Sequence, residues 1–130
     1  MRYLLDTHLL IWIADASLAG LLPEPARDIV EDVGNDVAFS AVSIWEIVIK
    51  NGLGRPDFQI DPATLRLGAL ACGYEELPVT SGHALAVADL APIHKDPFDR
   101  LLIAQARAEG MVLLTHDMAV AHYGANIQFV

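Results

Sequence analysis

Residues 1–14, MRYLLDTHLLIWIA, contain the pattern that decides the fold. Residues 3–5 form a short apolar run that ends at Asp6, as is typical of a buried strand, and residues 8–14 then have the pattern of a helix. Further strands are expected at 37–39, 77–79, 111–114 and 127–130. Strands that alternate with helices predict a mostly parallel sheet covered on both faces. We therefore expect an α/β fold, an α/β/α sandwich with a mostly parallel central sheet, in a single domain of residues 1–130.

Capping and stop residues mark the helices between these strands. Ser40 is suited to cap one helix, and Asp96 followed by Pro97 is a good start for another. Glycines at 34, 73 and 110 follow the expected ends of three helices. The resulting helices are expected at 23–33, 41–51, 62–72, 81–90 and 97–109.

The composition is that of an apolar domain without a membrane span. Hydrophobic residues make up 54% of the chain and the mean hydropathy is +0.39, but no apolar run approaches the roughly 20 residues of a spanning helix. The N-terminus reaches a charge too early for a secretory signal, so a cytoplasmic protein is expected. Cys72 is the single cysteine, which excludes an internal disulfide framework and a multi-cysteine zinc site. The apolar surplus favours a second buried surface, as in a homodimer or a partner groove.

The net charge is unusual for a protein that binds nucleic acid. Eight Lys and Arg residues oppose 17 Asp and Glu, for a formal charge of −9, whereas nucleic-acid binders usually carry a basic patch. Divalent cations in a carboxylate cluster, or a strongly basic protein partner, would reconcile the two. The acids between residues 24 and 36 are better explained as a solvated helix face.

Three acids stand where α/β sheets bind ligands. Asp6 follows the first expected strand and Asp117 follows the 111–114 strand, and such sheets place ligands beyond the carboxyl ends of their strands. Asp99 lies in the first turn of the helix that Asp96 is expected to cap. Asp6 and Asp117 could instead serve only as helix caps. The capping pattern explains Asp96 but leaves Asp99 ambiguous, because its helix is apolar nearly all round and a carboxylate at its mouth needs a partner.

Glu46 stands inside a helix that we expect to be largely buried, among apolar residues at 42–49. Ser43 and Glu46 have the spacing of a capping box, but if Ser40 is the cap then Glu46 lies too deep to serve in one. The alternative is a narrow polar stripe in which Glu46 pairs with Lys50 at i, i+4.

Other residues near these acids carry weaker hypotheses. Thr7 and Thr115 adjoin site acids and could orient them or cap turns, and Ser43 lies one turn before Glu46. His8 and His116 neighbour Asp6 and Asp117, but no spaced histidine pair makes a metal motif. The remaining candidates are RNA-contacting or merely solvated cations, and aromatic rings that either stack on bases or belong to a core or interface: Lys50, Arg55, Lys95, Arg100, Trp12 and Trp45.

Four strings in order along the chain resemble PIN-domain proteins, and more narrowly VapC-type toxins of toxin–antitoxin pairs: Asp6-Thr7-His8, Ser43-Ile44-Trp45-Glu46, Asp96-Pro97-Phe98-Asp99-Arg100 and Thr115-His116-Asp117. The resemblance implies an acidic quartet around Mg²⁺ or Mn²⁺, formed by Asp6, Glu46, Asp99 and Asp117, with Asp96 secondary. It also implies ribonuclease activity, homodimerisation and inhibition by a cognate VapB-type antitoxin, which places a basic or bulky segment in the acidic cleft.

Oxygen-only ligands independently favour Mg²⁺ or Mn²⁺ over zinc. We expect Asp6 and Asp99 to be the principal ligands, Glu46 and Asp117 to complete the cluster, and Thr7, Ser43, Asp96 and Thr115 to support it. Two other functions stay open. One is a Mg²⁺-dependent phosphohydrolase of another α/β family, although the dehalogenase type needs a second Asp where His8 stands. The other is a non-catalytic module that binds a basic protein.

Overall fold

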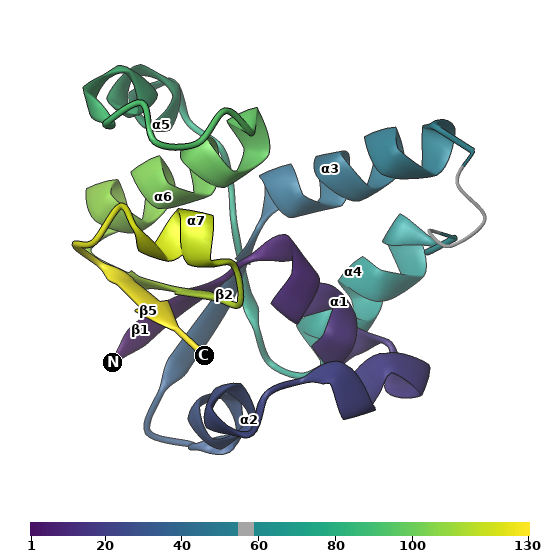
Figure 1. The fold of residues 1–130 in the computed structure, drawn as a ribbon. Helices are drawn as coiled ribbons and strands as arrows, with labels where there is room; N and C mark the ends of the chain where they lie inside the picture. Colours follow the sequence, from purple (N-terminus) through teal and green to yellow (C-terminus); the bar gives the residue numbers. More distant parts are fainter. Residues whose placement is uncertain (55–58) are drawn as a thin grey trace.

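A five-stranded parallel sheet forms the centre of the protein, in the order β3-β2-β1-β4-β5 (Figure 1). The computed structural model describes residues 1–54 and 59–130. The strands are β1 Arg2–Leu5, β2 Asp36–Ser40, β3 Glu75–Leu77, β4 Val112–Thr115 and β5 Ile127–Phe129. The expected sandwich is confirmed, and every strand pairing in the described residues is parallel.

One strand differs from its expected position. β3 ends at Leu77, so the expected 77–79 strand is wrong by two residues. The reason is Pro78, which has no N–H to give to a neighbouring strand. Its carbonyl instead accepts a hydrogen bond from Gln105 Nε2 at 3.3 Å.

The helices cover both faces of the sheet. They are α1 Thr7–Ala14, α2 Glu24–Glu31, α3 Ala41–Gly52, α4 Pro62–Ala71, α5 Ser81–Ala86, α6 Pro97–Glu109 and α7 Met118–Ala121. Short 3₁₀ turns follow α1 at Ala16–Leu21 and α5 at Val87–Asp89, so the expected 81–90 helix is divided in two. None of the described helices is long and apolar enough to cross a membrane.

Alternating strand residues divide the core into two layers. Tyr3 and Leu5 face one side, where α1, α2 and α4 pack, and Leu4 faces the other, where α6 and α7 pack (Figure 1). This is the period-two alternation of a strand buried on both faces. It fixes the carboxyl end of β1, and with it Asp6, in the middle of the sheet.

A buried polar network joins the ends of β2 and β3 to α5 and α6. Ser40 caps α3 through a bond from Val42 N and donates to Gln105 Oε1 at 2.6 Å. His83 Nδ1 accepts from Thr80 N in a capping box, and His83 Nε2 lies 3.0 Å from Glu109 Oε1. Because these buried groups satisfy one another, α3 and α6 are held in a fixed relation at the carboxyl edge of the sheet.

The expectation that α3 is largely buried is wrong. Trp45 is 58% exposed, Val48 49% and Leu53 65%, and Ile49 is also exposed. Figure 1 shows the reason: α3 starts at the sheet and runs out beyond it, so only its inner side is covered. The covered side carries Val42, Ser43, Glu46 and Ile47. We call the exposed set Trp45, Val48, Ile49 and Leu53 the α3 apolar face.

Gly110 ends α6 in the left-handed conformation, with φ of 65°. A Cβ at this position would meet nothing within 4 Å, so only the backbone conformation opposes a side chain. Gly110→Ala is therefore expected to lower the free energy of unfolding by about 1 kcal/mol in urea denaturation. Gly20→Ala is the matched control, since it also has open space but no positive φ. Equal effects of the two substitutions would contradict the conformational explanation.

Candidate active site

Asp6 lies at the carboxyl end of β1 and both of its carboxylate oxygens are held. Oδ1 accepts from Leu9 N at 2.8 Å and so caps α1. Oδ2 accepts from Thr115 Oγ1 at 2.6 Å and from His116 N at 3.3 Å, across from β4. Burial raises the pKa of Asp6, although these hydrogen bonds oppose the shift. Asp6 therefore caps α1, as the capping alternative predicted, and Thr115 holds its second carboxylate oxygen.

Glu46 lies on the inner side of α3 and is 2% exposed. Thr7 Oγ1 donates to Glu46 Oε1 at 2.7 Å and lies 2.9 Å from Ser43 Oγ. The Thr7 hydroxyl therefore contacts the Glu46 carboxylate directly, and the Ser43 hydroxyl contacts Thr7. Glu46 Oε2 pairs with Lys50 Nζ at 2.5 Å. The i, i+4 pairing with Lys50 that the polar-stripe alternative predicted is therefore confirmed. Ser40 is the α3 cap, as expected.

Asp99 lies in the first turn of α6, behind the cap. Asp96 Oδ1 accepts from Phe98 N and Asp99 N, which confirms it as the N-cap. Asp99 Oδ2 lies 2.9 Å from His94 Nε2. Burial raises the pKa of Asp99 to about 6, helped by the charges of Asp96 and Glu46 and opposed by His94. Glu46 and Asp99 are therefore close enough to interact electrostatically.

Asp117 is exposed at the carboxyl end of β4, where it caps α7 by accepting from Ala119 N. Its ligand oxygen, one from Asp99 and a ring nitrogen of His94 all lie within 4.8 Å of one another. Ligands of a hard divalent cation sit about 2.0–2.6 Å from it, so opposite ligands are separated by about 4–5 Å. The spacing and the two carboxylates fit such an ion.

The four predicted acids lie at one edge of the sheet, linked pair by pair. Asp99 and Asp117 share the cluster with His94, Glu46 acts on Asp99, and Asp6 and Asp117 line one pocket of about 320 Å³. Asp99 and Asp117 are the two acids with ligand oxygens within 4.8 Å of each other, while the oxygens of Asp6 and Glu46 accept hydrogen bonds or an ion pair from other groups. The arrangement can concentrate negative charge around a cation and present it at an open pocket.

His94 is the site residue that sequence reasoning missed. It lies in a loop, where no periodicity marks it, and Arg100 and Tyr123 hold it there. Arg100 donates to Ala91 O at 2.9 Å and to Tyr123 Oη at 3.0 Å, and His94 N donates to the same Tyr123 oxygen at 2.8 Å. The usable signal is the histidine itself, shortly before Asp96 and Asp99.

Two of the cations considered as RNA contacts, Arg100 and Lys50, bind oxygens of the protein itself. Arg100 supports the His94 loop and Lys50 pairs with Glu46. Lys95 is exposed. Arg55 lies outside the described residues. Of these candidates, Arg100 and Lys50 are thus engaged within the protein, and Lys95 is the exposed one among the described residues.

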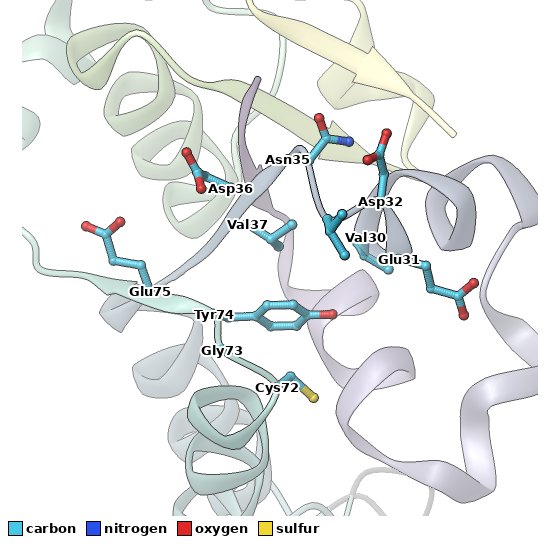
Figure 2. Close-up of a pocket in the computed structure, with 11 residues that line it drawn as sticks. Val30, Glu31, Asp32, Asn35, Asp36, Val37, Cys72, Gly73, Tyr74 and Glu75 are labelled. Atoms are coloured by element: carbon cyan, nitrogen blue, oxygen red, sulfur yellow. The ribbon is translucent and has the colours of Figure 1, made fainter.

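A larger pocket of about 370 Å³ lies at the opposite edge, beside the amino ends of β2 and β3 (Figure 2). Figure 2 shows the Tyr74 ring among Val30, Val37 and Cys72. Burial and the nearby Cys72 and Glu31 raise the pKa of Tyr74 to about 12. The charged residues that line this pocket are all acids: Glu31, Asp32, Asp36 and Glu75. They lie at the opposite end of the strands from Asp6 and Asp117.

Sequence comparison agrees with this geometry. The profile of the PIN domain matches residues 3–126. The chain belongs to the PIN-domain family. Comparison with curated proteins finds no match.

Solved structures share the whole PIN fold at low sequence identity. VapBC2 from Rickettsia felis, bound to a DNA fragment from their promoter, aligns with a TM-score of 0.67 at 13% identity, covering 100% of this chain and 98% of that one. VapBC-1 from nontypeable Haemophilus influenzae aligns with a TM-score of 0.66 at 19% identity, covering 100% of this chain and 97% of that one. VapBC-5 from Mycobacterium tuberculosis aligns with a TM-score of 0.54 at 20% identity, covering 99% of this chain and 97% of that one. Their likeness shows that the PIN domain here has the fold of chains found in toxin–antitoxin complexes.

The raised pKa of Asp99 has a testable source in its neighbour on α6. Asp96→Asn keeps an N-cap side chain but removes a charge, so the pKa of Asp99 should fall below about 6. Carboxyl-carbon NMR titration in EDTA measures it. The matched control is Asp61→Asn, which alters the N-cap before Pro62 on α4 and should leave Asp99 unchanged. An unaltered Asp99 titration in Asp96→Asn would refute this cause.

The same shift makes stability depend on pH. The pKa of Asp99 is about 6 in the folded protein against an ordinary value of 3.8, so the native state holds the proton more tightly. Its contribution to the free energy of unfolding is therefore present below pH 3.8 and is lost as the pH rises to about 6. Asp99→Asn should flatten this decline in urea denaturation across that range. A decline as steep as that of the wild-type protein would place its origin elsewhere.

Proposed function

We propose that this PIN domain is a Mg²⁺- or Mn²⁺-dependent endoribonuclease and the toxin of a toxin–antitoxin pair. The observation that carries the proposal is the gathering of Asp6, Glu46, Asp99 and Asp117 at the carboxyl edge of the sheet. Such an edge is where parallel α/β sheets bind ligands. Mutual repulsion of buried carboxylates is a cost that a divalent cation relieves.

The sequence favours Asp6 and Asp99 as the principal ligands, but we give the place of Asp6 to Asp117, because a ligand oxygen of Asp117 lies within 4.8 Å of one from Asp99. Asp99 and Asp117 would hold the ion directly, and Asp6 and Glu46 would complete the cluster after small side-chain movements or through waters. When bound, a divalent cation would polarise the scissile phosphate of the RNA and lower the pKa of a bound water, which favours in-line hydrolysis. His94, at 2.9 Å from Asp99, orients that carboxylate or joins the ligands. Asp96 supports the site by capping the helix that presents Asp99.

Hydroxyl groups of the protein orient the carboxylates of Asp6 and Glu46. Thr115 fixes one Asp6 oxygen and Thr7 fixes one Glu46 oxygen, while Ser43 backs Thr7. Because these bonds are buried, they hold the carboxylates in one orientation instead of letting them turn apart.

A basic antitoxin segment is the partner that suits this charge. The protein carries −9 overall, and its acids converge on an open edge that a Lys or Arg side chain could enter as a cation substitute. The related folds occur in VapBC complexes, which supports a cognate VapB-type antitoxin. A toxin that acts on cellular RNA also places the protein in the cytoplasm.

The α3 apolar face supports a homodimer. Four large apolar side chains exposed along one side of a helix exceed what a monomer usually leaves in water. Trp45 also packs its ring edge-on against Phe98 of α6, with centroids 5.3 Å apart, so the face continues toward the Asp99 helix.

A non-catalytic module is the second candidate. The observation in its favour is that Lys50 and His94 already pair with two of the acids. Such a domain would bind a basic partner with the same acids but leave RNA intact. A phosphohydrolase of another family loses ground, because the chain belongs to the PIN family.

Purified protein should cleave cellular RNA with Mg²⁺ or Mn²⁺ and not with EDTA, and Asp6→Asn should abolish cleavage while keeping the fold. Thr115→Val keeps the shape of the side chain but removes its hydrogen bond to Asp6, so the rate of RNA cleavage should fall about 10–100-fold. Product analysis on gels measures both. Asp36→Asn, an exposed acid at the amino end of β2, is the control that stays active. Metal binding without cleavage in folded, antitoxin-free protein would favour the non-catalytic module.

Trp45→Asp should convert the dimer to a monomer, since a charge in the centre of the α3 apolar face disfavours its burial. Light scattering after size-exclusion chromatography gives the mass. Leu67→Asp on α4 is the control, because Leu67 is 63% exposed but lies outside the face. A wild-type monomer, or a dimer that survives Trp45→Asp, would remove this face from consideration.

A further inference from the structure

A pocket of about 320 Å³ adjoins the acidic cluster on the side of β4 and α1. Asp6 and Asp117 form the wall that it shares with the cluster. Its other walls are rings and a thioether, from His8, Trp12, His116 and Met118. We call this the Trp12 pocket. From the sequence, Trp12 is a candidate for a base contact or for the core or an interface, and in the structure it is half-buried at this pocket.

The aromatic walls form a continuous series. His8 and Trp12 have ring centroids 6.0 Å apart, and Trp12 meets His116 edge-on at 5.7 Å. His116 in turn stacks on Phe129 at 5.3 Å, with 21° between the planes. These rings come from α1, the β4–α7 connection and β5, so three separate elements meet to build one surface.

The rings are held in place before any ligand binds. His116 Nδ1 donates to Val130 O at 2.9 Å, which fixes the ring plane, and His116 N donates to Asp6 Oδ2 at 3.3 Å. Trp12 is partly buried and packs against the core. A preformed aromatic surface loses little entropy when a flat ligand stacks on it.

We infer that the Trp12 pocket stacks an unpaired RNA base of the nucleotide next to the scissile phosphate. This inference rests on the proposed ribonuclease function and names how the substrate is held. Because the pocket shares Asp6 and Asp117 with the cluster, a base in it lies one nucleotide away from a phosphate at the cluster. Bases within a duplex are already stacked on each other, so the pocket selects single-stranded RNA.

The charge of the protein explains why stacking is needed. Most single-strand binders combine cationic grooves with aromatic platforms. Here the net charge is −9, and Lys50 and Arg100 are engaged with the protein's own oxygens. Stacking on Trp12 and the two histidines attracts the base without a cationic groove.

Trp12→Ala tests the stacking directly. The probe is a short, fluorescein-labelled single-stranded RNA of mixed sequence, bound in Ca²⁺ and checked on a gel for integrity. Removal of the ring should weaken binding about tenfold or more, from anisotropy, and Trp12→Phe should restore most of it. Leu67→Ala, an exposed apolar truncation on α4, should bind as wild type does.

Two further measurements protect the test against misfolding. His8→Ala removes an exposed ring at the pocket without touching the core and should also weaken binding. In Trp45→Phe, Trp12 is the remaining tryptophan, so the protein's tryptophan fluorescence reports on Trp12 alone. Binding of the same RNA should quench this fluorescence over the same range of concentrations in which the anisotropy of the labelled RNA rises to its plateau.

The outcomes separate this inference from the proposed function. Wild-type binding by both Trp12→Ala and His8→Ala overturns the pocket even if the protein cleaves RNA. Trp12 quenching together with weakened variants supports the pocket even if the protein cleaves nothing, in which case the ribonuclease proposal fails alone. No RNA binding by the wild-type protein overturns the pocket as well.

Discussion

The bond network around Asp6 is the contact on which the rest of the site depends. Asp6 ends β1, caps α1 and accepts from Thr115 and His116 at the end of β4. One carboxylate therefore ties the two central strands to the first helix at the edge where the other acids gather. Its burial opposes ionisation, and hydrogen bonds from Thr115, Leu9 and His116 together with the charge of His8 oppose that effect. The site is thus built on an electrostatically costly group that a cation can relieve.

The neighbouring acids show two other ways to carry buried charge. Glu46 is paired with Lys50 along its own helix, and Asp99 is paired with His94 from the preceding loop. Each pairing leaves a carboxylate near the cluster but reduces repulsion within it. Together with bonded hydroxyls, these pairs explain how a domain of this charge keeps several acids at one edge without disrupting α3 and α6.

Much of this arrangement could be predicted from the sequence, and the remainder could not for physical reasons. Strands that end at Asp6 and near Asp117, and caps at Ser40 and Asp96, are local patterns, so they place the acids correctly. His94 was missed because its position depends on Arg100 and Tyr123, distant contacts that leave no periodic trace. The exposed side of α3 was missed because apolar content cannot tell a core from a surface awaiting a partner. The pairing of Glu46 with Lys50 is one of the two alternatives that the sequence left open for Glu46, and the structure shows that pairing.

Consecutive residues of α3 face opposite environments, with Trp45 in solvent and Glu46 buried. A rigid helix cannot tilt to improve one of these faces without moving the other. If a second subunit seats on Trp45, the position of Glu46 is set partly by the neighbour, and the active edge becomes sensitive to protein concentration. Assembly and chemistry then evolve as linked traits, since any drift in the subunit contact is felt one residue away at the carboxylate.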